Sequence, residues 1–191
     1  LTIMQRRSVI QSGAWFALAL LLAAPSRVLA SNQQRLHKPL INALMQINRP
    51  VTRLLANRLD DCLSAANSYN LHLRSASLTT DDAQLIAKAL RRMHKSQHLR
   101  LMSFSMSYNP DIGDLGVGEV LNALPDNTTE LGLVGCELDD NASTHIVEFI
   151  QRSKTLRMVC VEDNKFSTDA KRSSNVSTMS NVGQSAFKTR L

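Results

Sequence analysis

One spacing of apolar residues constrains the fold of this 191-residue chain more than any other feature. Segment 101–109 reads LMSFSMSYN, with apolar residues at its first, fourth and sixth places and Asn at the ninth. Segment 156–164, LRMVCVEDN, repeats this arrangement, and two weaker copies, 68–76 and 128–136, end in Ala and Cys. Apolar residues so closely spaced, followed by a polar turn, predict four short strands that each bury one side.

A helical pattern follows these strands. After segment 68–76, for example, Asp81 and Asp82 precede Ile86, Ala87 and Leu90. A polar start and then apolar residues three and four apart predict an amphipathic helix. One strand and one helix cannot bury their apolar sides alone, so we expect neighbouring units to stack side by side.

The strand motif together with its helix resembles the leucine-rich repeat, in particular the ribonuclease-inhibitor-like class with about 28 residues per repeat. The resemblance covers residues 68–170. It implies an α/β fold, namely a short solenoid of strand–turn–helix repeats whose strands line a concave face. The Asn or Cys at the ninth place is then expected to turn inward and to hydrogen-bond backbone groups in the bend.

The segments that flank the repeats differ in pattern. Residues 31–67 have apolar residues mostly three or four apart with a break at Pro50, which predicts an N-terminal cap of two helices. Residues 171–191 are polar and without period, which predicts a disordered tail. No C-terminal cap is recognisable, so the last strand is a candidate site of self-association. Copies of the chain that stack end to end through this strand would form a homo-oligomer.

The first thirty residues have the layout of a bacterial signal peptide. Arg6 and Arg7 precede an apolar run over residues 13–24, and cleavage is expected after Ala30. The run is far shorter than the ~20 residues of a membrane-spanning helix. The paired arginines resemble the twin-arginine export signal, with the general secretory route, a core helix and an uncleaved anchor as the alternatives. The expected location is therefore periplasmic or secreted, without a stable membrane span after cleavage.

The formal charge of +6 raises the question of nucleic-acid binding. Three of the 22 basic residues and none of the 16 acidic residues lie in residues 1–30, so 19 basic residues face 16 acidic ones in the remainder. Aromatic residues make up only 4% of the chain, too few for the stacking platforms that bind single-stranded nucleic acid. We therefore expect a protein partner of unknown identity, and no nucleic acid.

The sequence contains no recognisable catalytic or metal-binding constellation. The three cysteines include no C-x-x-C pair, and Cys136 and Cys160 are expected on opposite sides of the strands, which argues against a disulfide. The five histidines are scattered and are expected at the surface. The prediction is a non-catalytic protein without a cofactor or a metal ion.

The concave strand face is the expected binding surface, as is usual for solenoids. The candidate binding residues on it are Tyr69, His72, Arg74, Ser105, Ser107, Tyr108, Arg157, Glu162 and Asp163. They are mixed in type, so a merely solvated polar face is the alternative. The predicted function is non-catalytic protein binding, and the alternative is an envelope structural or assembly factor that self-associates through its last repeat.

Overall fold

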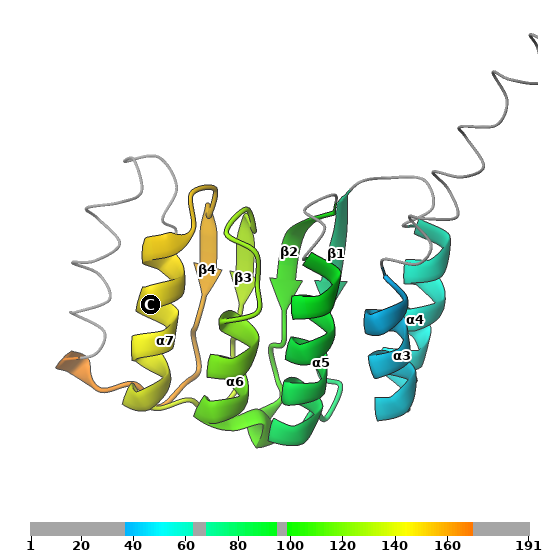
Figure 1. Cartoon of the computed structure of the whole chain (residues 1–191). Helices are drawn as coiled ribbons and strands as arrows, with labels where there is room; N and C mark the ends of the chain where they lie inside the picture. The colour runs from blue at the N-terminus through cyan, green and yellow to red at the C-terminus, as the bar shows by residue number, and fades with distance from the viewer. Residues whose placement is uncertain (1–36, 63–67, 95–98, 170–191) are drawn as a thin grey trace, which may run out of the picture.

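The computed structural model describes residues 37–62, 68–94 and 99–169. The predicted signal peptide, including Arg6, Arg7 and Ala30, and the predicted polar tail lie outside these residues. The described part has an α/β fold with one parallel sheet in the order β1-β2-β3-β4 (Figure 1). The predicted α/β class is therefore confirmed.

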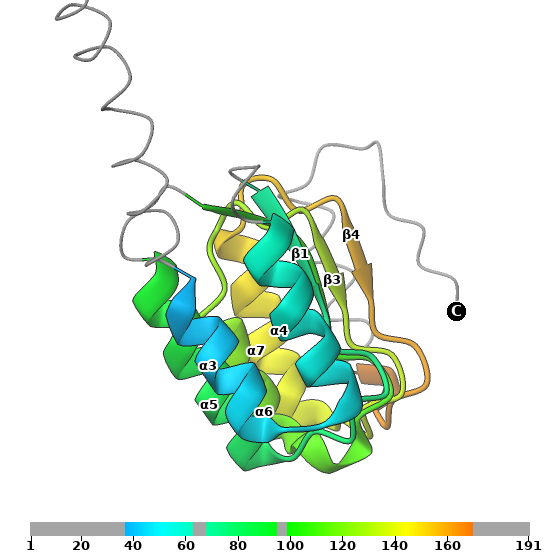
Figure 2. The same cartoon turned by 90° about the vertical axis from the view of Figure 1, so that its right-hand side faces the viewer.

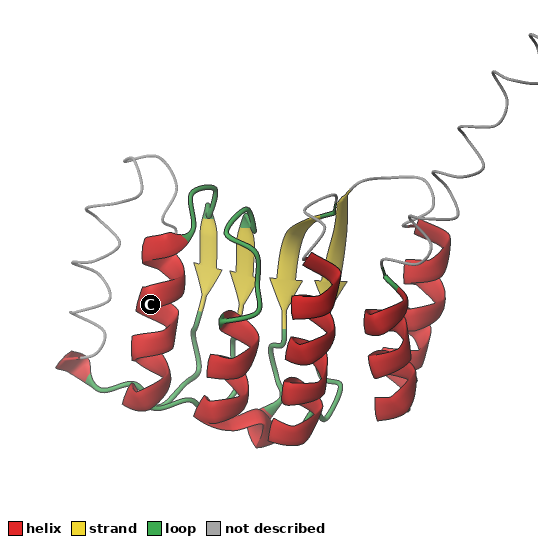
Figure 3. Ribbon diagram, in the orientation of Figure 1, coloured by secondary structure: helices red, strands yellow, loops and turns green. Residues whose placement is uncertain are grey.

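Strands and helices alternate along the chain after an initial pair of helices (Figure 3). The strands are β1 (Ser68–His72), β2 (Arg100–Ser105), β3 (Glu130–Gly132) and β4 (Met158–Cys160). The helices are α3 (Lys38–Ile47), α4 (Pro50–Cys62), α5 (Thr80–Met93), α6 (Gly113–Leu121), α7 (Asp140–Arg152) and the short 3-10 helix η2 (Pro110–Ile112). Helices α5, α6 and α7 pack in a row on one side of the sheet (Figure 2). We call the opposite side of the sheet the open face.

The register of the sheet pairs residues that hold the same place in the sequence motif. Leu71 pairs with Phe104, Phe104 with Leu131, and Leu131 with Val159. All four side chains are buried between the strands and the helices. The fourth place of each motif thus forms one continuous apolar row across the core.

The start of β1 departs from the motif. The pairing shifts after Tyr69, so that Tyr69 lies opposite Leu101 and only one residue separates it from Leu71. Tyr69 is consequently buried, whereas Ser68, which we had expected at the first apolar place, is exposed. The prediction that Tyr69 lies on the open face is therefore wrong, because β1 alternates regularly and Tyr69 points to the same side as Leu71, whereas the extra residue of the irregularity, Met102, lies in β2.

After each strand, the residue just before the inward-turning ninth motif place has a left-handed backbone conformation. The four residues are Ser75, Tyr108, Gly135 and Asp163, with φ between 51° and 61°. This conformation is costly for residues other than glycine. Its recurrence at one motif place indicates that the turn is required to direct the next side chain inward.

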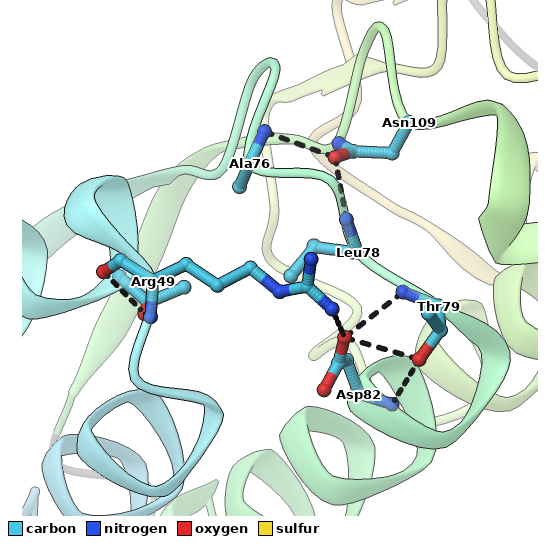
Figure 4. Close-up of polar contacts among 7 residues, drawn as sticks. Arg49, Ala76, Leu78, Thr79, Asp82 and Asn109 are labelled. Atoms are coloured by element: carbon cyan, nitrogen blue, oxygen red, sulfur yellow. Dashed lines mark hydrogen bonds and ion pairs between the residues drawn. The ribbon is translucent and has the colours of Figure 1, made fainter.

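The inward-turning asparagines bind the backbone of the neighbouring unit. Asn109 Oδ1 accepts hydrogen bonds from the N–H groups of Ala76 and Leu78, as Figure 4 shows, and its Nδ2 donates to Leu73 O and Met106 O. Asn164 makes the same set of bonds two strands further along the sheet, to the backbone of residues 133–138 and to Val161 O. The predicted role of the ninth place is confirmed for both residues.

Cys136 holds the ninth place between these two asparagines. Its Sγ donates to Met106 O over 3.3 Å, and its side chain is fully buried. Cys136 and Cys160 are both free thiols, and Cys160 lies opposite Gly132 on the other side of the strands. The expectation that these two cysteines do not pair is confirmed.

The two helices predicted near the N-terminus are present. Helix α3 packs against α5, and α4 contacts β1, so both lie at the β1 end of the sheet. The break between them is a left-handed Asn48 followed by Arg49, whose Nη2 binds Asp82 Oδ2 over 2.8 Å (Figure 4). Asp82 Oδ2 also accepts from Thr79 N–H in the capping box that starts α5. A single carboxylate thus fixes the start of α5 to the preceding helices.

Gly116 allows α6 to lie close to α5. A Cβ on this residue would be 3.1 Å from Ala83 Cβ and 3.2 Å from Thr80 Cα. We expect Gly116→Leu to lower the free energy of unfolding by about 1–3 kcal/mol, because the added side chain forces the helices apart. Urea unfolding measures the change, with the exposed Lys88→Leu on α5 as the control. Equal stability of the two variants would contradict the close packing.

No helix in the described segments is long and apolar enough to cross a membrane.

Candidate binding surface on the open face of the sheet

Three rows of side chains cross the open face from β1 to β4. They alternate with the buried motif residues, because successive side chains of a strand point to opposite sides. The rows are Asn70, Ser103, Glu130 and Met158; His72, Ser105, Gly132 and Cys160; and Arg74, Ser107, Val134 and Glu162. The third row continues the register just beyond the strands, where Ser75 N–H donates to Ser107 O and Gly135 N–H to Glu162 O.

The β1 end of the third row carries a cation stacked on an aromatic ring. The guanidinium carbon of Arg74 lies 4.3 Å from the centre of the Tyr108 ring. Tyr108 is 40% exposed, and its ring also lies beside Gly135, where a Cβ would be 3.0 Å from it. Such a cation–π contact holds the guanidinium in place while leaving its N–H groups free for hydrogen bonds. Arg74 makes no ion pair within the described residues.

Hydroxyl groups form the centre of the open face. His72 Nε2 and Ser103 Oγ are 2.8 Å apart, and Ser105 Oγ donates to Ser107 Oγ over 3.2 Å. The Ser107 hydroxyl also accepts from Val134 N–H over 3.1 Å. Ser107 is buried, so the expectation that it is available on the open face is wrong. Its hydroxyl bonds the backbone of the segment that follows β3, beside the backbone bond from Tyr108 N–H to Val134 O.

The β4 end of the open face is acidic. Burial first, and then the charges of Glu162 and Glu130, raise the pKa of the Cys160 thiol, so Cys160 is protonated at neutral pH. One oxygen of Glu162, Oε2, is shielded from solvent without a hydrogen-bond partner among the described residues. Asp163 is exposed in the following left-handed turn. Charge therefore changes sign across the sheet, from Arg74 at β1 to these carboxylates at β4.

Most of the predicted binding residues come together on this surface. His72, Arg74, Ser105, Tyr108, Glu162 and Asp163 lie on the open face or in the turns at its edge. Arg157 is exposed but precedes β4, five residues before Glu162, and falls outside the three rows. Glu130, which the sequence places on this face, was not among the candidate binding residues, and neither were Met158 and the Arg74–Tyr108 contact. Alternation from the fourth motif place identifies Glu130 and Met158, whereas the cation–π contact depends on turn geometry that the sequence does not reveal.

Two histidines, His37 and His94, differ from the surface positions expected for them, whereas His72 is exposed as expected. His37 is fully buried, and His94 lies against Tyr69 with 2.9 Å between Nε2 and Oη and with the two rings stacked. Burial lowers the pKa of His94 from 6.5 to about 4, against a smaller opposing effect of a backbone hydrogen bond with Leu99. Burial likewise raises the pKa of Tyr69. Both side chains are therefore neutral structural groups at pH 7.

The lowered pKa of His94 predicts acid sensitivity. Between pH 6.5 and about 4 the unfolded chain binds a proton at His94 that the folded chain rejects, so the free energy of unfolding falls as the pH falls. The slope from this group is at most about 1.4 kcal/mol per pH unit. Urea unfolding at pH 7, 5.5 and 4.5 measures it, and His94→Gln should flatten the profile. An NMR titration of His94 with a midpoint near 6.5 would refute this prediction.

Within the described segments, no group of three or more His, Cys, Asp or Glu side chains is placed to hold a metal ion. Neither protein-family models nor curated proteins gave a match to the chain. The open face thus defines the candidate site by its geometry and charge alone.

Proposed function

We propose that the chain is a short leucine-rich-repeat solenoid of the ribonuclease-inhibitor-like type. The proposal is supported by the pairing of equivalent motif residues across the sheet. It is also supported by the recurring left-handed turn and by the matching hydrogen bonds of Asn109 and Asn164. In this account α3 and α4 form the cap at the β1 end, because they cover the side of the first unit that has no preceding strand.

The function that this geometry favours is non-catalytic binding of a protein partner through the open face. The observation that carries the proposal is the contrast between the two sides of the sheet. One side is buried by three helices, while the other presents an exposed Arg74–Tyr108 pair, a 44% exposed Met158 and unpaired carboxylates. Exposed Arg, Tyr and Met are residue types that are enriched where proteins bind one another.

Blocking the open face tests this function. The immobilised full chain is exposed to an envelope extract of the producing cell, in parallel with Ser103→Trp on the open face and Lys88→Trp on the helix side. The captured proteins should be lost with Ser103→Trp and kept with Lys88→Trp. Loss with Lys88→Trp alone would place binding on the helices. Circular dichroism verifies that both variants fold.

Export is part of the proposal and is supported by the layout of residues 1–30. Sequencing the N-terminus of protein recovered from the periplasm should give a chain that begins at Ser31. A chain that retains Arg6 and Arg7 would argue against cleavage.

Self-association through β4 is a second candidate function. It is favoured by the position of β4 at the edge of the sheet, where no described strand pairs with its outer side. Sedimentation at increasing protein concentration tests it. A chain that stays monomeric at every concentration would contradict self-association.

A further inference from the structure

The third row of the open face places opposite charges at its two ends. Arg74 lies at the β1 end and Glu162 at the β4 end, and neither makes an ion pair within the described residues. Neighbouring strands are ~4.8 Å apart, so three strand spacings separate the two charges by about 14 Å. Two cations lie near β4: Lys165 pairs with Glu137, and Arg157 is five residues from Glu162, which along a strand corresponds to about 16 Å.

The middle of the third row has small side chains and is partly apolar. It consists of the buried Ser107 and the partly buried Val134, next to Ser105 and Gly132 of the second row. A Cβ on Gly132 would be 2.8 Å from Ser105 Oγ, so the small Ser105 side chain lies over Gly132 and no larger side chain rises from this part of the sheet. Small side chains between two larger charged ones allow the backbone of another chain to approach the sheet closely.

These dimensions match an extended peptide that crosses the strands. An extended chain rises about 3.3 Å per residue, and its residues i, i+2 and i+4 point to the same side. Residues i and i+4 are therefore about 13 Å apart and can reach both ends of the row at once, while residue i+2 faces Val134. Opposite charges at i and i+4 complement Arg74 and Glu162.

We propose that the open face binds an extended segment of a partner protein that carries one acidic and one basic residue four positions apart. The acidic residue binds Arg74, whose guanidinium is oriented by Tyr108 and can pair with both oxygens of a carboxylate. The basic residue binds the Glu162 and Asp163 end. This inference rests on the proposed binding function and names the chemistry of its ligand.

Selection from a displayed library of random twelve-residue peptides tests the pairing rule. Peptides that the immobilised full chain enriches should contain an acid and a base four residues apart more often than the unselected library. Arg74→Glu should instead select two bases at this spacing, and Glu162→Lys two acids. Each reversal should weaken the peptides selected on the unaltered chain about 5- to 10-fold at low salt. The matched reversal Lys88→Glu, on the helix side, should leave both the motif and the affinities unchanged.

The outcomes separate this inference from the proposed function. Peptides that Val134→Trp, a bulky change in the third row, abolishes but that show no charge pair at this spacing overturn the inference and leave open-face binding in place. Peptides whose binding survives Val134→Trp overturn the inference, and peptides that also survive Ser103→Trp in the first row overturn both. Failure to enrich any peptide overturns the inference. A dimer that Arg74→Glu dissociates in sedimentation identifies a second copy of this chain as the occupant, which also overturns it.

Discussion

Replacing Asn109 by Ala is expected to lower the free energy of unfolding by about 3–5 kcal/mol, because each buried polar group left without a partner costs about 1–3 kcal/mol. The Asn109 side chain is fully buried and bonds two N–H groups and two carbonyls. Without this side chain, the N–H groups of Ala76 and Leu78, in the bend before α5, have no hydrogen-bond acceptor. A domain of ordinary stability has about 5–15 kcal/mol in total, so this variant is close to unfolding.

Asn164→Ala is the matched control for this prediction. Asn164 makes the same kinds of bonds, but its side chain is only partly buried. Water can replace part of what is lost, so the expected destabilisation is about 1–2 kcal/mol. Urea unfolding followed by circular dichroism gives both values. An Asn109→Ala variant no less stable than Asn164→Ala would show that these bonds do not hold neighbouring units together.

Phe104→Ala is expected to destabilise the fold by about 3–5 kcal/mol, the usual cost of emptying a buried aromatic site. Phe104 is 1% exposed and lies on β2, between Leu71 of β1 and Leu131 of β3. The vacated space is enclosed by strands on both sides and by the helices, so the surroundings have little freedom to collapse into it.

The equivalent change at the edge of the sheet provides the comparison. Val159 holds the same motif place on β4, is 7% exposed and has one described strand neighbour. Val159→Ala should cost about 1–2 kcal/mol, since it removes fewer atoms from a site that relaxes more easily. Denaturant midpoints of the two variants measure the difference. Equal losses would indicate that β2 is not the centre of the core.

The strand cores could be predicted from the sequence because their signal is local. Leu101, Phe104 and Met106 are buried as their spacing indicates, and Asn109 turns inward as the ninth place requires. These features depend on strand alternation and on the need to satisfy buried backbone groups, both of which act within a few residues.

The two errors have different causes. Tyr69 was expected on the open face, but it lies two residues before Leu71, and alternation along β1 points both side chains to the buried side, where Tyr69 contacts His94. Ser107 occupies an open-face place in the alternation, yet its hydroxyl is used by Val134 N–H of the next strand segment. This cross-strand bond has no signature in the residues that make it, because it depends on long-range register.

Photo-crosslinking tests most directly the central claim that the open face binds a protein partner. The photoreactive residue p-benzoylphenylalanine is placed at Asn70 or Met158 on the open face, and at Lys88 or Gln151 on the helix side, in the full chain within the producing cell. All four residues are exposed. The account predicts crosslinks to one common protein from Asn70 and Met158 and none to it from Lys88 and Gln151. Crosslinks from the helix positions alone would contradict it.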